Sequence, residues 1–367
     1  MAKRVLMVAT VAATIGSFNM NNIRILQDLG YDVDVAADFT DVSVWSEERL
    51  SGFKKQLSDM SVNAIQLDFS RNPLKFEKHI DSYREAVRLL KDKQYSFIHT
   101  HTPISSAIMR LAAHKTSTKV IYTAHGFHFY DGAPLKNWIV FYPVEKFLSK
   151  WTDVLITITK EDYKRASKHF NAKNTVYIPG VGVDIEKFKP DENRRDKIRN
   201  ELSIPVDRIL LVSVGELNEN KNHERVIRAI SGLKNITYVI VGKGDRKLKL
   251  EEVAAECGVD LRLPGFRTDV VDFYNAADIY ILPSIREGLN VSLMEAMACG
   301  LPCCVGRIRG NVDLVNDCLF TPIDERQIRD AISKAIEKKV ELGQKNLHKI
   351  QNFSVKNVND LMRKIYK

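Results

Sequence analysis

The chain has 367 residues, of which 44% are hydrophobic and 28% are charged, and its formal net charge is +9. This length and composition are typical of a globular protein with two domains, and no apolar run approaches the length that spans a membrane. The positive charge favours anionic partners such as nucleotides, diphosphates or acidic lipids. Nucleic acid is not expected, because the chain has no basic tail, zinc motif or aromatic and basic stretch of the RNA-binding kind.

The N-terminus and the cysteines bear on the compartment of the protein. Residues 1–10 read either as a signal peptide or as a first buried strand, and we favour the strand because the apolar run is short and a helix follows. The five cysteines have no metal-ligand spacing. Their odd number and apolar surroundings fit reduced, buried thiols, so we expect a cytoplasmic protein.

The first half of the chain alternates short apolar strands with amphipathic helices. Such alternation predicts a parallel sheet covered by helices on both faces, in which ligands bind at the carboxyl ends of the strands. The expected strands are 3–9, 32–36, 63–68, 96–101, 118–124, 153–158 and 175–178, and the expected helices are 17–29, 73–92, 104–114, 136–150 and 160–170.

The segment 10–18 is expected to be the loop after the first strand. Its Gly16 and Ser17 either let a phosphate or an acceptor approach the backbone, or Ser17 caps the next helix. The loop lacks the G-x-G-x-x-G pattern, which argues against dinucleotide binding and therefore against an NAD-dependent oxidoreductase.

Four histidines follow two later strands of the first half and are expected near one crevice: His99, His101, His125 and His128. A metal site is one interpretation, but no Asp, Glu or Cys partner has diagnostic spacing, so we expect no metal. A histidine that acts as a polar contact or general base at a strand end is favoured, and His125 is the best placed.

The segment 136–151 is the most aromatic of the chain and contains Pro143, which should kink the helix. Its Trp and Phe side chains lie beside lysines, a pattern typical of helices that lie on a lipid surface. A helix that packs into the core is the alternative. The basic helix 73–93 would add attraction to anionic lipid.

A glycine-rich stretch at 179–184 follows a strand and precedes a charged run, so we place the hinge between two domains there. The second half then repeats the alternation of strands and helices. The expected strands are 208–214, 236–241, 260–263, 278–282, 303–305 and 318–320, and the expected helices are 222–232, 246–257, 269–276, 290–299 and 324–338.

The turn after the strand 208–214 is suited to bind phosphate. It runs from Gly215 to Lys221 and opens a helix, so that it combines backbone N–H groups with one cation. Its spacing is not that of a P-loop. A partial G-x-G at 242–244 reads as a tight turn.

The stretch 283–302 carries the clearest functional signal. Glu287 should lie in the loop after a buried strand and Glu295 in the second turn of the following helix, so both carboxylates can face one crevice. Residues 288–290 would present backbone N–H groups at the helix start, where negative charge is favoured. This arrangement suggests a bound nucleotide-sugar, and a surface helix with two solvated glutamates is the alternative.

These stretches together resemble the family 4 glycosyltransferases of the GT-B type over nearly the whole chain. The matching stretches are 287–289 through 295–302, 215–222, 264–266, 277–278 with 283–284, 182–184 with Phe188, and 125–126. Two further stretches, 99–103 and 123–130, look most like the subgroup that builds bacterial capsular polysaccharide and exopolysaccharide.

The resemblance implies an α/β fold of two Rossmann-like domains with parallel sheets that face each other across a cleft. Residues 1–182 would bind the acceptor, residues 183–350 would bind the nucleotide-sugar, and a helix within residues 351–367 would return to the first domain.

The resemblance also implies roles for individual residues. Glu295 would bind ribose hydroxyls, and Glu287 and His125 would act at the reacting sugar, so the last two are the expected catalytic residues. The expected donor-binding residues are Gly16, Gly215, Glu216, Lys221, Gly265, Phe266, Arg267, Gly288, Leu289, Asn290 and Glu295. The acceptor-side candidates are Ser17, His99, His101 and His128.

The implied reaction is the transfer of a sugar, with retention, from a UDP-hexose or UDP-N-acetylhexosamine to a glycan on a polyprenyl diphosphate. It would take place at the anionic inner face of the cell membrane, without a cofactor or Mg²⁺. A UDP-sugar epimerase-like enzyme of the same fold and a nucleotide-sugar binding module without turnover are the alternatives.

One position departs from the family pattern. The family often has Arg after the glycine of the first phosphate loop, and this chain has Glu216. Either another cation replaces that Arg, with Arg286, Arg307 and Arg309 as candidates, or Glu216 points elsewhere.

Overall fold

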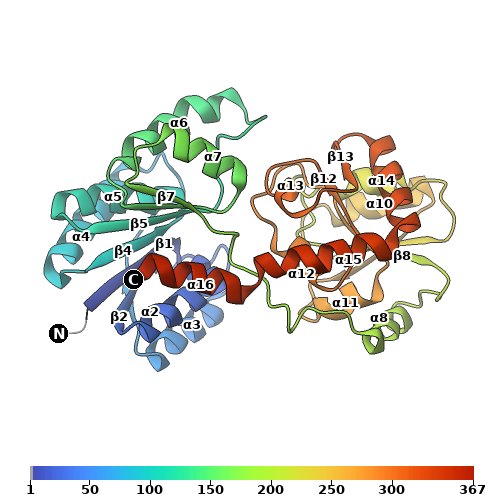
Figure 1. Cartoon of the computed structure of the whole chain (residues 1–367), viewed down its shortest axis with the longest axis horizontal. Coiled ribbons are helices and arrows are strands. Elements are labelled where there is room, and N and C mark those ends of the chain that lie inside the picture. Colours follow the sequence, from blue (N-terminus) through green and yellow to red (C-terminus); the bar gives the residue numbers. More distant parts are fainter. Residues whose placement is uncertain (1–2) are drawn as a thin grey trace. The chain divides into compact units, whose positions relative to one another are not determined.

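The computed structural model describes residues 3–367 and comprises two compact units (Figure 1). Unit 1 contains the chain up to Val181 together with Val358–Lys367, and unit 2 contains Gly182–Asn357. The sequence-based boundary between the two halves lay after residue 182. Each unit holds one parallel sheet with helices around it, which confirms the predicted α/β fold class.

Unit 1 is built on seven strands within the described residues, all parallel and in the order β3-β2-β1-β4-β5-β6-β7. Its elements are β1 (Lys3–Val11), α1 (Ala12–Phe18), α2 (Met20–Asp28), β2 (Tyr31–Asp38), α3 (Glu47–Asp59), β3 (Asn63–Gln66), α4 (Phe76–Lys93), β4 (Phe97–His101), α5 (Pro103–Thr116), β5 (Lys119–Ala124), α6 (Leu135–Ser149), β6 (Val154–Thr157), α7 (Lys160–His169) and β7 (Asn174–Tyr177).

The register of the central strands brings the histidines of β4 to the carboxyl edge of the sheet. His99 pairs with Met7 of β1, and His101 pairs with Thr123 at the end of β5. Every residue of β4 is buried, as expected for a strand covered on both faces. The side chains of His99 and His101 therefore leave the sheet on the same face, two residues apart.

The last helix of the chain, α16 (Val355–Tyr366), completes the core of unit 1. Val358, Met362 and Tyr366 recur at intervals of four residues, and all three are buried in the main apolar cluster of this unit. The Tyr366 ring stacks on Phe97 with 6.0 Å between ring centroids. In Figure 1 this red helix lies beside the blue N-terminal elements of the same unit.

Unit 2 is built on six parallel strands within the described residues, in the order β10-β9-β8-β11-β12-β13. Its elements are η1 (Glu192–Arg194), α8 (Arg195–Glu201), β8 (Ile209–Val214), α9 (His223–Ala229), β9 (Ile236–Val241), α10 (Lys247–Cys257), β10 (Asp260–Gly265), α11 (Val270–Ala276), β11 (Ile279–Leu282), α12 (Val291–Ala298), β12 (Cys303–Gly306), α13 (Asn311–Leu314), β13 (Leu319–Phe320), α14 (Glu325–Glu337), α15 (Lys339–Ile350) and η2 (Gln351–Phe353).

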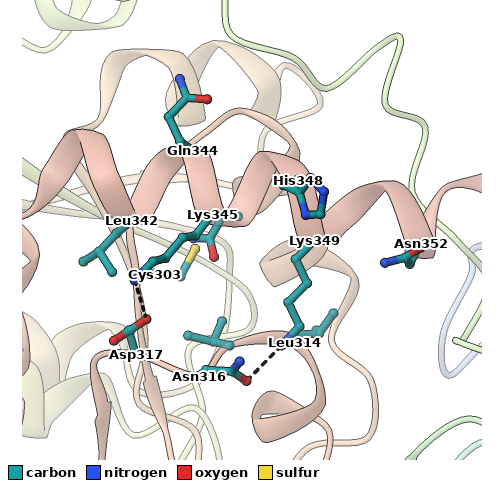
Figure 2. Close-up of a pocket in the computed structure, with 12 residues that line it drawn as sticks. Cys303, Leu314, Asn316, Asp317, Leu342, Gln344, Lys345, His348, Lys349 and Asn352 are labelled. Carbon is teal, nitrogen blue, oxygen red and sulfur yellow. Dashed lines mark hydrogen bonds and ion pairs between the residues drawn. The ribbon is translucent and has the colours of Figure 1, made fainter.

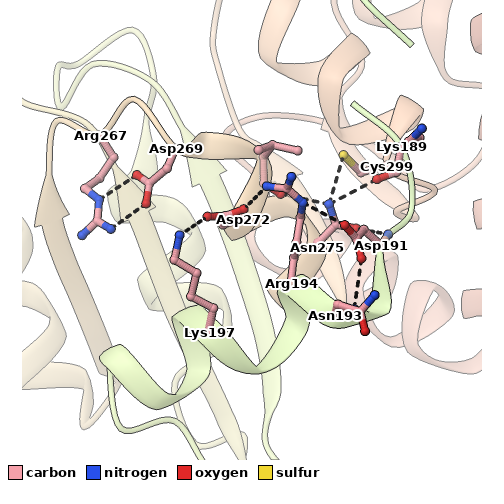
Figure 3. Close-up of polar contacts among 11 residues, drawn as sticks. Lys189, Asp191, Asn193, Arg194, Lys197, Arg267, Asp269, Asp272, Asn275 and Cys299 are labelled. Atoms are coloured by element: carbon pink, nitrogen blue, oxygen red, sulfur yellow. Dashed lines mark hydrogen bonds and ion pairs between the residues drawn. The ribbon is translucent and has the colours of Figure 1, made fainter. Parts of the chain in front are cut away.

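Ion pairs fasten the start of unit 2 to α11 (Figure 3). Arg194 and Lys197 both pair with the carboxylate of Asp272, whose side chain is 3% exposed. Nearby, the backbone N–H of Asp191 donates to the side-chain oxygen of Asn275 at 2.7 Å. Because these pairs surround a nearly buried carboxylate, they hold η1 and α8 firmly against the body of the unit.

The two connections between the units run through paired backbone on the unit 2 side. The N–H of Val183 donates to the carbonyl of Phe353 at 2.9 Å, and the N–H of Val355 donates to the carbonyl of Val183 at 3.0 Å. Gly182 has φ +77°, and a Cβ there would lie 2.7 Å from the Cα of Val355. Only glycine fits such a close approach of two backbones in this conformation.

Several sequence-based boundaries are wrong. The helix expected at 17–29 is two helices, α1 and α2, that meet at Asn19, and the segment 10–18 is strand end and helix, not a loop. Gly16 and Ser17 therefore lie within α1, and a Cβ on Gly16 would lie 2.3 Å from the Trp45 ring. Gly16 is explained by this packing, and Ser17 caps no helix start. The helices α3 and α15 were not predicted, and α6 continues through Pro143.

Candidate active site

A buried ion pair joins the two phosphate-suited loops of unit 2. Nζ of Lys221, in the loop after β8, lies 2.6 Å from Oε1 of Glu287, in the loop after β11. Their side chains are only 16% and 13% exposed. The two strands are neighbours in the sheet, so parallel strand order alone brings their carboxyl ends together. A lysine and a glutamate predicted to serve the same ligand are thus in direct contact.

Backbone hydrogen bonds hold these two loops together. The backbone carbonyl of Asn220 accepts a hydrogen bond from the N–H of Ile285. The side-chain nitrogen of Asn220 donates to the carbonyl of Arg286. The turn after β9 packs on the first loop so closely that a Cβ at Gly242 would lie 1.8 Å from the carbonyl oxygen of Gly215. The two turns therefore meet backbone to backbone, which only a glycine at residue 242 permits.

The start of α12 is anchored to the same strand ends. Asn290 caps the helix by accepting a hydrogen bond from the N–H of Leu293 at 3.0 Å. The Ser292 hydroxyl donates to the carbonyl of Val214, the last residue of β8. The helix N-terminus, with its partial positive charge, is therefore fixed beside the turn that carries Lys221.

The second glutamate, Glu295, lies on α12 in a half-buried position. Its Oε2 accepts a hydrogen bond from the Tyr274 hydroxyl at 2.8 Å. Burial raises the pKa of the Glu295 carboxyl above its usual range, although the Tyr274 hydrogen bond works in the opposite direction. Within residues 3–367, Oε1 of Glu295 has no hydrogen-bond partner, so it can accept one from a ligand hydroxyl.

In unit 1, three histidines meet at the carboxyl edge of the sheet. The His99 and His101 rings lie 4.2 Å apart, and Nδ1 of His101 is 3.0 Å from Nε2 of His125. His99 bonds to the hydroxyls of Tyr366 and Thr123, at 2.7 and 2.8 Å. These three rings form a connected row from the C-terminal helix to the loop after β5.

Burial keeps all three of these histidines neutral at ordinary pH. It lowers the pKa of His99 to about 3 and that of His125 to about 4, and for His99 the nearby His125 contributes further. The pKa of His101 is lowered well below its usual range by burial and then by its two histidine neighbours. A neutral imidazole has one donor and one acceptor nitrogen, so the roles of His101 and His125, which are hydrogen-bonded to each other, are linked.

Comparison with known proteins decides the family. Residues 194–353 match the family described as Glycosyl transferases group 1, and residues 16–187 match Glycosyltransferase Family 4. The candidate glycosyltransferase EpsD of Bacillus subtilis (strain 168) is 33% identical over 328 residues, which are 86% of this chain and 82% of that protein. The chain is a family 4 glycosyltransferase.

Two further relatives add to this picture. The UDP-Gal:alpha-D-GlcNAc-diphosphoundecaprenol alpha-1,3-galactosyltransferase of Escherichia coli is 30% identical to this glycosyltransferase, over 71% of this chain and 70% of that protein. The crystal structure of Anabaena Alr3699/HepE in complex with UDP has the same fold, with a TM-score of 0.80 at 18% identity and 99% of each chain covered. The GT-B fold of this glycosyltransferase is thereby confirmed.

The structure places most predicted donor residues of the glycosyltransferase around one group of loops. Gly215, Gly242 and Gly265 are linked, because the N–H of Gly215 bonds to the end of β9 and the N–H of Gly242 donates to the carbonyl of Gly265. Leu289 is buried, and a Cβ on Gly310 would lie 1.7 Å from the carbonyl oxygen of Gly288. The loop that contains Arg309 therefore packs directly on residue 288.

Two predicted residues have other surroundings. Glu216 is exposed, and its carboxylate accepts a hydrogen bond from the Asn218 side chain. Arg267 pairs with Glu201 and Asp269, and these pairs raise its pKa. Binding of the donor by Arg267 stays a prediction.

Two other residues of the prediction stand apart. Phe266 is 64% exposed, so its ring is accessible for stacking. His128 is exposed and stacks on Phe141, with 4.5 Å between ring centroids. Of the four histidines expected near one crevice, His99, His101 and His125 are in mutual contact, and the place of His128 beside them stays a prediction.

A separate pocket of about 520 Å³ lies between α15 and the segment that follows α13 (Figure 2). Its lysines already have partners: Lys345 pairs with Asp317 and Glu341, and Lys349 bonds to Asn316. None of the predicted site residues is among the described residues that line it. We therefore assign it no role in the reaction.

Across residues 3–367, no three His, Cys, Asp or Glu side chains are grouped so that they could hold a metal ion. No helix in the same range combines the length and apolar character needed to cross a membrane.

Proposed function

We propose that this glycosyltransferase transfers a hexose or N-acetylhexosamine from a UDP-sugar to a glycan on a polyprenyl diphosphate, in capsule or exopolysaccharide synthesis. The observation that carries the proposal is the Lys221–Glu287 pair at the ends of β8 and β11. The Escherichia coli relative supports it, because its name specifies a UDP-sugar donor and a diphosphoundecaprenol-linked acceptor. The Anabaena structure with UDP supports the choice of nucleotide.

Binding of the donor would exchange the partners of Lys221. Without donor, Glu287 neutralises the ammonium at 2.6 Å. A diphosphate carries more negative charge than one carboxylate, so it draws Lys221 toward itself and releases Glu287 to accept hydrogen bonds from the sugar. Oε1 of Glu295, already oriented by Tyr274, accepts a hydrogen bond from the ribose.

Loss of UDP is the difficult step, and the groups of unit 2 stabilise the charge that develops on it. In this mechanism Lys221 and the N-terminus of α12 interact with the diphosphate, and Mg²⁺ takes no part. The bond between the sugar carbon and the diphosphate oxygen breaks, the acceptor oxygen bonds to that carbon on the same face, and the acceptor proton passes to the diphosphate oxygen. Glu287 stabilises positive charge at the sugar carbon and forms no covalent bond. His125 is the proposed catalytic histidine of unit 1.

The surface of α6 supports an acceptor carried by a membrane. Five large apolar side chains of this helix are each 49% to 73% exposed: Leu135, Ile139, Val140, Val144 and Phe147. Nζ of Lys150 lies 3.8 Å from the centroid of the Phe147 ring, so a cation borders these apolar side chains. An apolar face with basic flanks suits the surface of an anionic bilayer. We propose that the protein binds the inner face of the cell membrane through α6.

A mass-spectrometric screen tests the proposal. UDP-, GDP- and dTDP-sugars are each incubated with the purified protein and synthetic lipid-diphosphate sugars, and a parallel set contains the donor alone. We expect a glycosylated lipid from one UDP-sugar only. An epimerised or hydrolysed sugar in the donor-only set would favour an epimerase-like enzyme. Binding of UDP with no product in any combination would identify a binding module and refute transfer.

A further inference from the structure

His101 combines nearly complete burial with an unused hydrogen-bonding nitrogen. It is 1% exposed, and its Nδ1 lies 3.0 Å from Nε2 of His125. Within residues 3–367, its Nε2 is shielded from solvent and has no hydrogen-bond partner. Such a nitrogen has lost its water without replacement, which is unfavourable and uncommon in folded proteins. The atom therefore indicates a ligand group.

A small cavity lies beside this histidine. His101 lines it together with His125, Thr123, Asn19 and Asn22, and its volume is about 30 Å³. A space of that size admits a single hydroxyl group or a water molecule, and its walls offer further amide and hydroxyl partners. A whole sugar ring does not fit, so only one hydroxyl of an acceptor could enter.

The backbone that follows His101 is held in a rare conformation. Thr102 has φ 65° and ψ 141°, which a β-branched residue seldom adopts. Its hydroxyl bonds to Thr10 at the end of β1 and to Ser105 at the start of α5, each at 2.8 Å. Two neighbouring elements thus hold this strained turn, and the turn fixes where the His101 ring lies.

Two neutral histidines joined through ring nitrogens have linked tautomers. If Nδ1 of His101 carries the proton, it donates to Nε2 of His125, and Nδ1 of His125 becomes a donor. If Nε2 of His101 carries the proton, Nε2 of His125 donates instead, and Nδ1 of His125 becomes an acceptor. If the group that contacts Nε2 of His101 donates a hydrogen bond, Nδ1 of His125 is a donor, and if that group accepts one, Nδ1 of His125 is an acceptor.

We propose that His101 is a positioning residue that sets the tautomer of His125, and that one hydroxyl group in the adjoining cavity, from water or from the acceptor sugar, sets the tautomer of His101. This deepens the proposed function, because it rests on His125 as the catalytic histidine. The neutral state that the scheme requires agrees with the lowered pKa of both groups.

Nitrogen-15 NMR of the histidine rings in the full-length protein tests the first part. His101→Phe keeps a ring and removes both nitrogens, and His99→Phe is the matched control, since His99 has the same strand and burial but bonds to Tyr366 and Thr123. We expect His101→Phe to move the His125 nitrogens from one fixed tautomer toward a mixture and His99→Phe to leave them unchanged. Identical His125 spectra in His101→Phe and wild type, or equal shifts in both variants, overturn the proposal.

Activity supplies a second reading that separates this proposal from the proposed function. In the transfer assay we expect His101→Phe to lower kcat about 10- to 100-fold with less change in the KM of the donor, as for loss of an orienting partner. Equal kcat in folded His101→Phe and wild type overturns the positioning role. If wild type itself transfers no sugar, the proposed function fails while the NMR result still decides the link between the two rings.

The source of the hydroxyl is tested in the wild-type protein with the methyl α-glycoside of N-acetylglucosamine as probe. A shift of the His101 Nε2 signal on its addition assigns the hydroxyl to the acceptor. An unchanged signal with a cross-peak to water assigns it to a bound water. A nitrogen with no hydrogen bond in either sample overturns the cavity part of the proposal.

Discussion

The hydroxyl of Tyr366, one residue from the C-terminus, lies 2.7 Å from Nδ1 of His99 inside the core of unit 1. Both side chains are buried, and the rings meet edge to face with 5.7 Å between their centroids. The last helix therefore contributes a polar partner, as well as apolar surface, to the strand that also carries His101. One hydrogen bond therefore links the packing of the last helix to the position of the His99 ring.

Replacing Tyr366 with Phe should destabilise unit 1 without changing its packing volume. The variant leaves Nδ1 of His99 buried and unpaired, which should lower the free energy of unfolding by about 1–3 kcal/mol. Urea unfolding followed by tryptophan fluorescence measures this directly, because all three tryptophans, Trp45, Trp138 and Trp151, lie in unit 1. Tyr163→Phe, at a partly exposed position, is the control. Superimposable unfolding curves for Tyr366→Phe and wild type would contradict the role of the bond.

Loss of either donor contact in unit 2 should cost orders of magnitude in transfer. Lys221→Ala removes the cation that stabilises the departing diphosphate, and Glu295→Ala removes the ribose contact. We expect kcat/KM to fall about 10²- to 10³-fold in each variant. Lys247→Ala, which changes an exposed lysine paired with Glu251, should stay near wild type. Wild-type turnover by either folded site variant would refute the site assignment.

Chelation of metal should leave the reaction unaffected. The proposed mechanism uses Lys221 and the N-terminus of α12 to stabilise negative charge, so the initial rate of transfer should be the same in EDTA as in Mg²⁺. The assay compares EDTA, EDTA followed by excess Mg²⁺, and untreated protein. Activity that disappears in EDTA and returns with Mg²⁺ would show that the metal-free mechanism is wrong.

Mild acid should destabilise unit 1 through its neutral histidines. The pKa of His99 is lowered to about 3 and that of His125 to about 4. Between these values and about 6.5 the unfolded chain binds protons that the folded chain does not, so the free energy of unfolding rises with pH in this window. His99→Gln removes one such group and should reduce the slope between about pH 5 and about pH 6 by about 1 kcal/mol per pH unit. Equal slopes in the two proteins would argue that His99 titrates normally.

Charges on the exposed side of α6 should abolish membrane binding. A double variant, Ile139→Glu with Val144→Glu, places two carboxylates where the bilayer is expected, and it should remain in the bottom fraction when anionic vesicles float. Leu248→Glu is the matched control, since Leu248 is 78% exposed on unit 2 and belongs to no apolar face that we assign to lipid. Wild-type protein that fails to float with anionic vesicles would remove the membrane part of the proposed function.

Apolar periodicity predicted the two sheets because buried parallel strands are continuous hydrophobic runs, as in β1 and β9. Apolar periodicity did not identify α3, although Ser46 caps its start and Leu50, Phe53 and Leu57 line one side of it. Its low overall hydrophobicity hid that pattern. In the segment 10–18 a loop was expected, but α1 begins directly after β1 and the chain is helical there.

For the site, the alternation of strands and helices predicted that ligands bind at the carboxyl ends of parallel strands, and the family resemblance pointed to the residues. It could not predict the direct Lys221–Glu287 pair or the approach of His101 to His125, because both depend on side-chain directions across neighbouring strands. The bond from Tyr366 to His99 was equally out of reach, since it depends on where a helix 267 residues later packs.

Unit 1 is discontinuous in the chain, because it contains the residues up to Val181 and those from Val358 to Lys367. A stop codon after residue 181 would yield a fragment without Val358, Met362 and Tyr366, and so with an open gap in its core. A stand-alone version of this half would instead need residue 181 spliced to residue 358 by a short designed linker. Loss of residues 358–367 would thus damage the N-terminal half, although these residues follow unit 2 in the sequence.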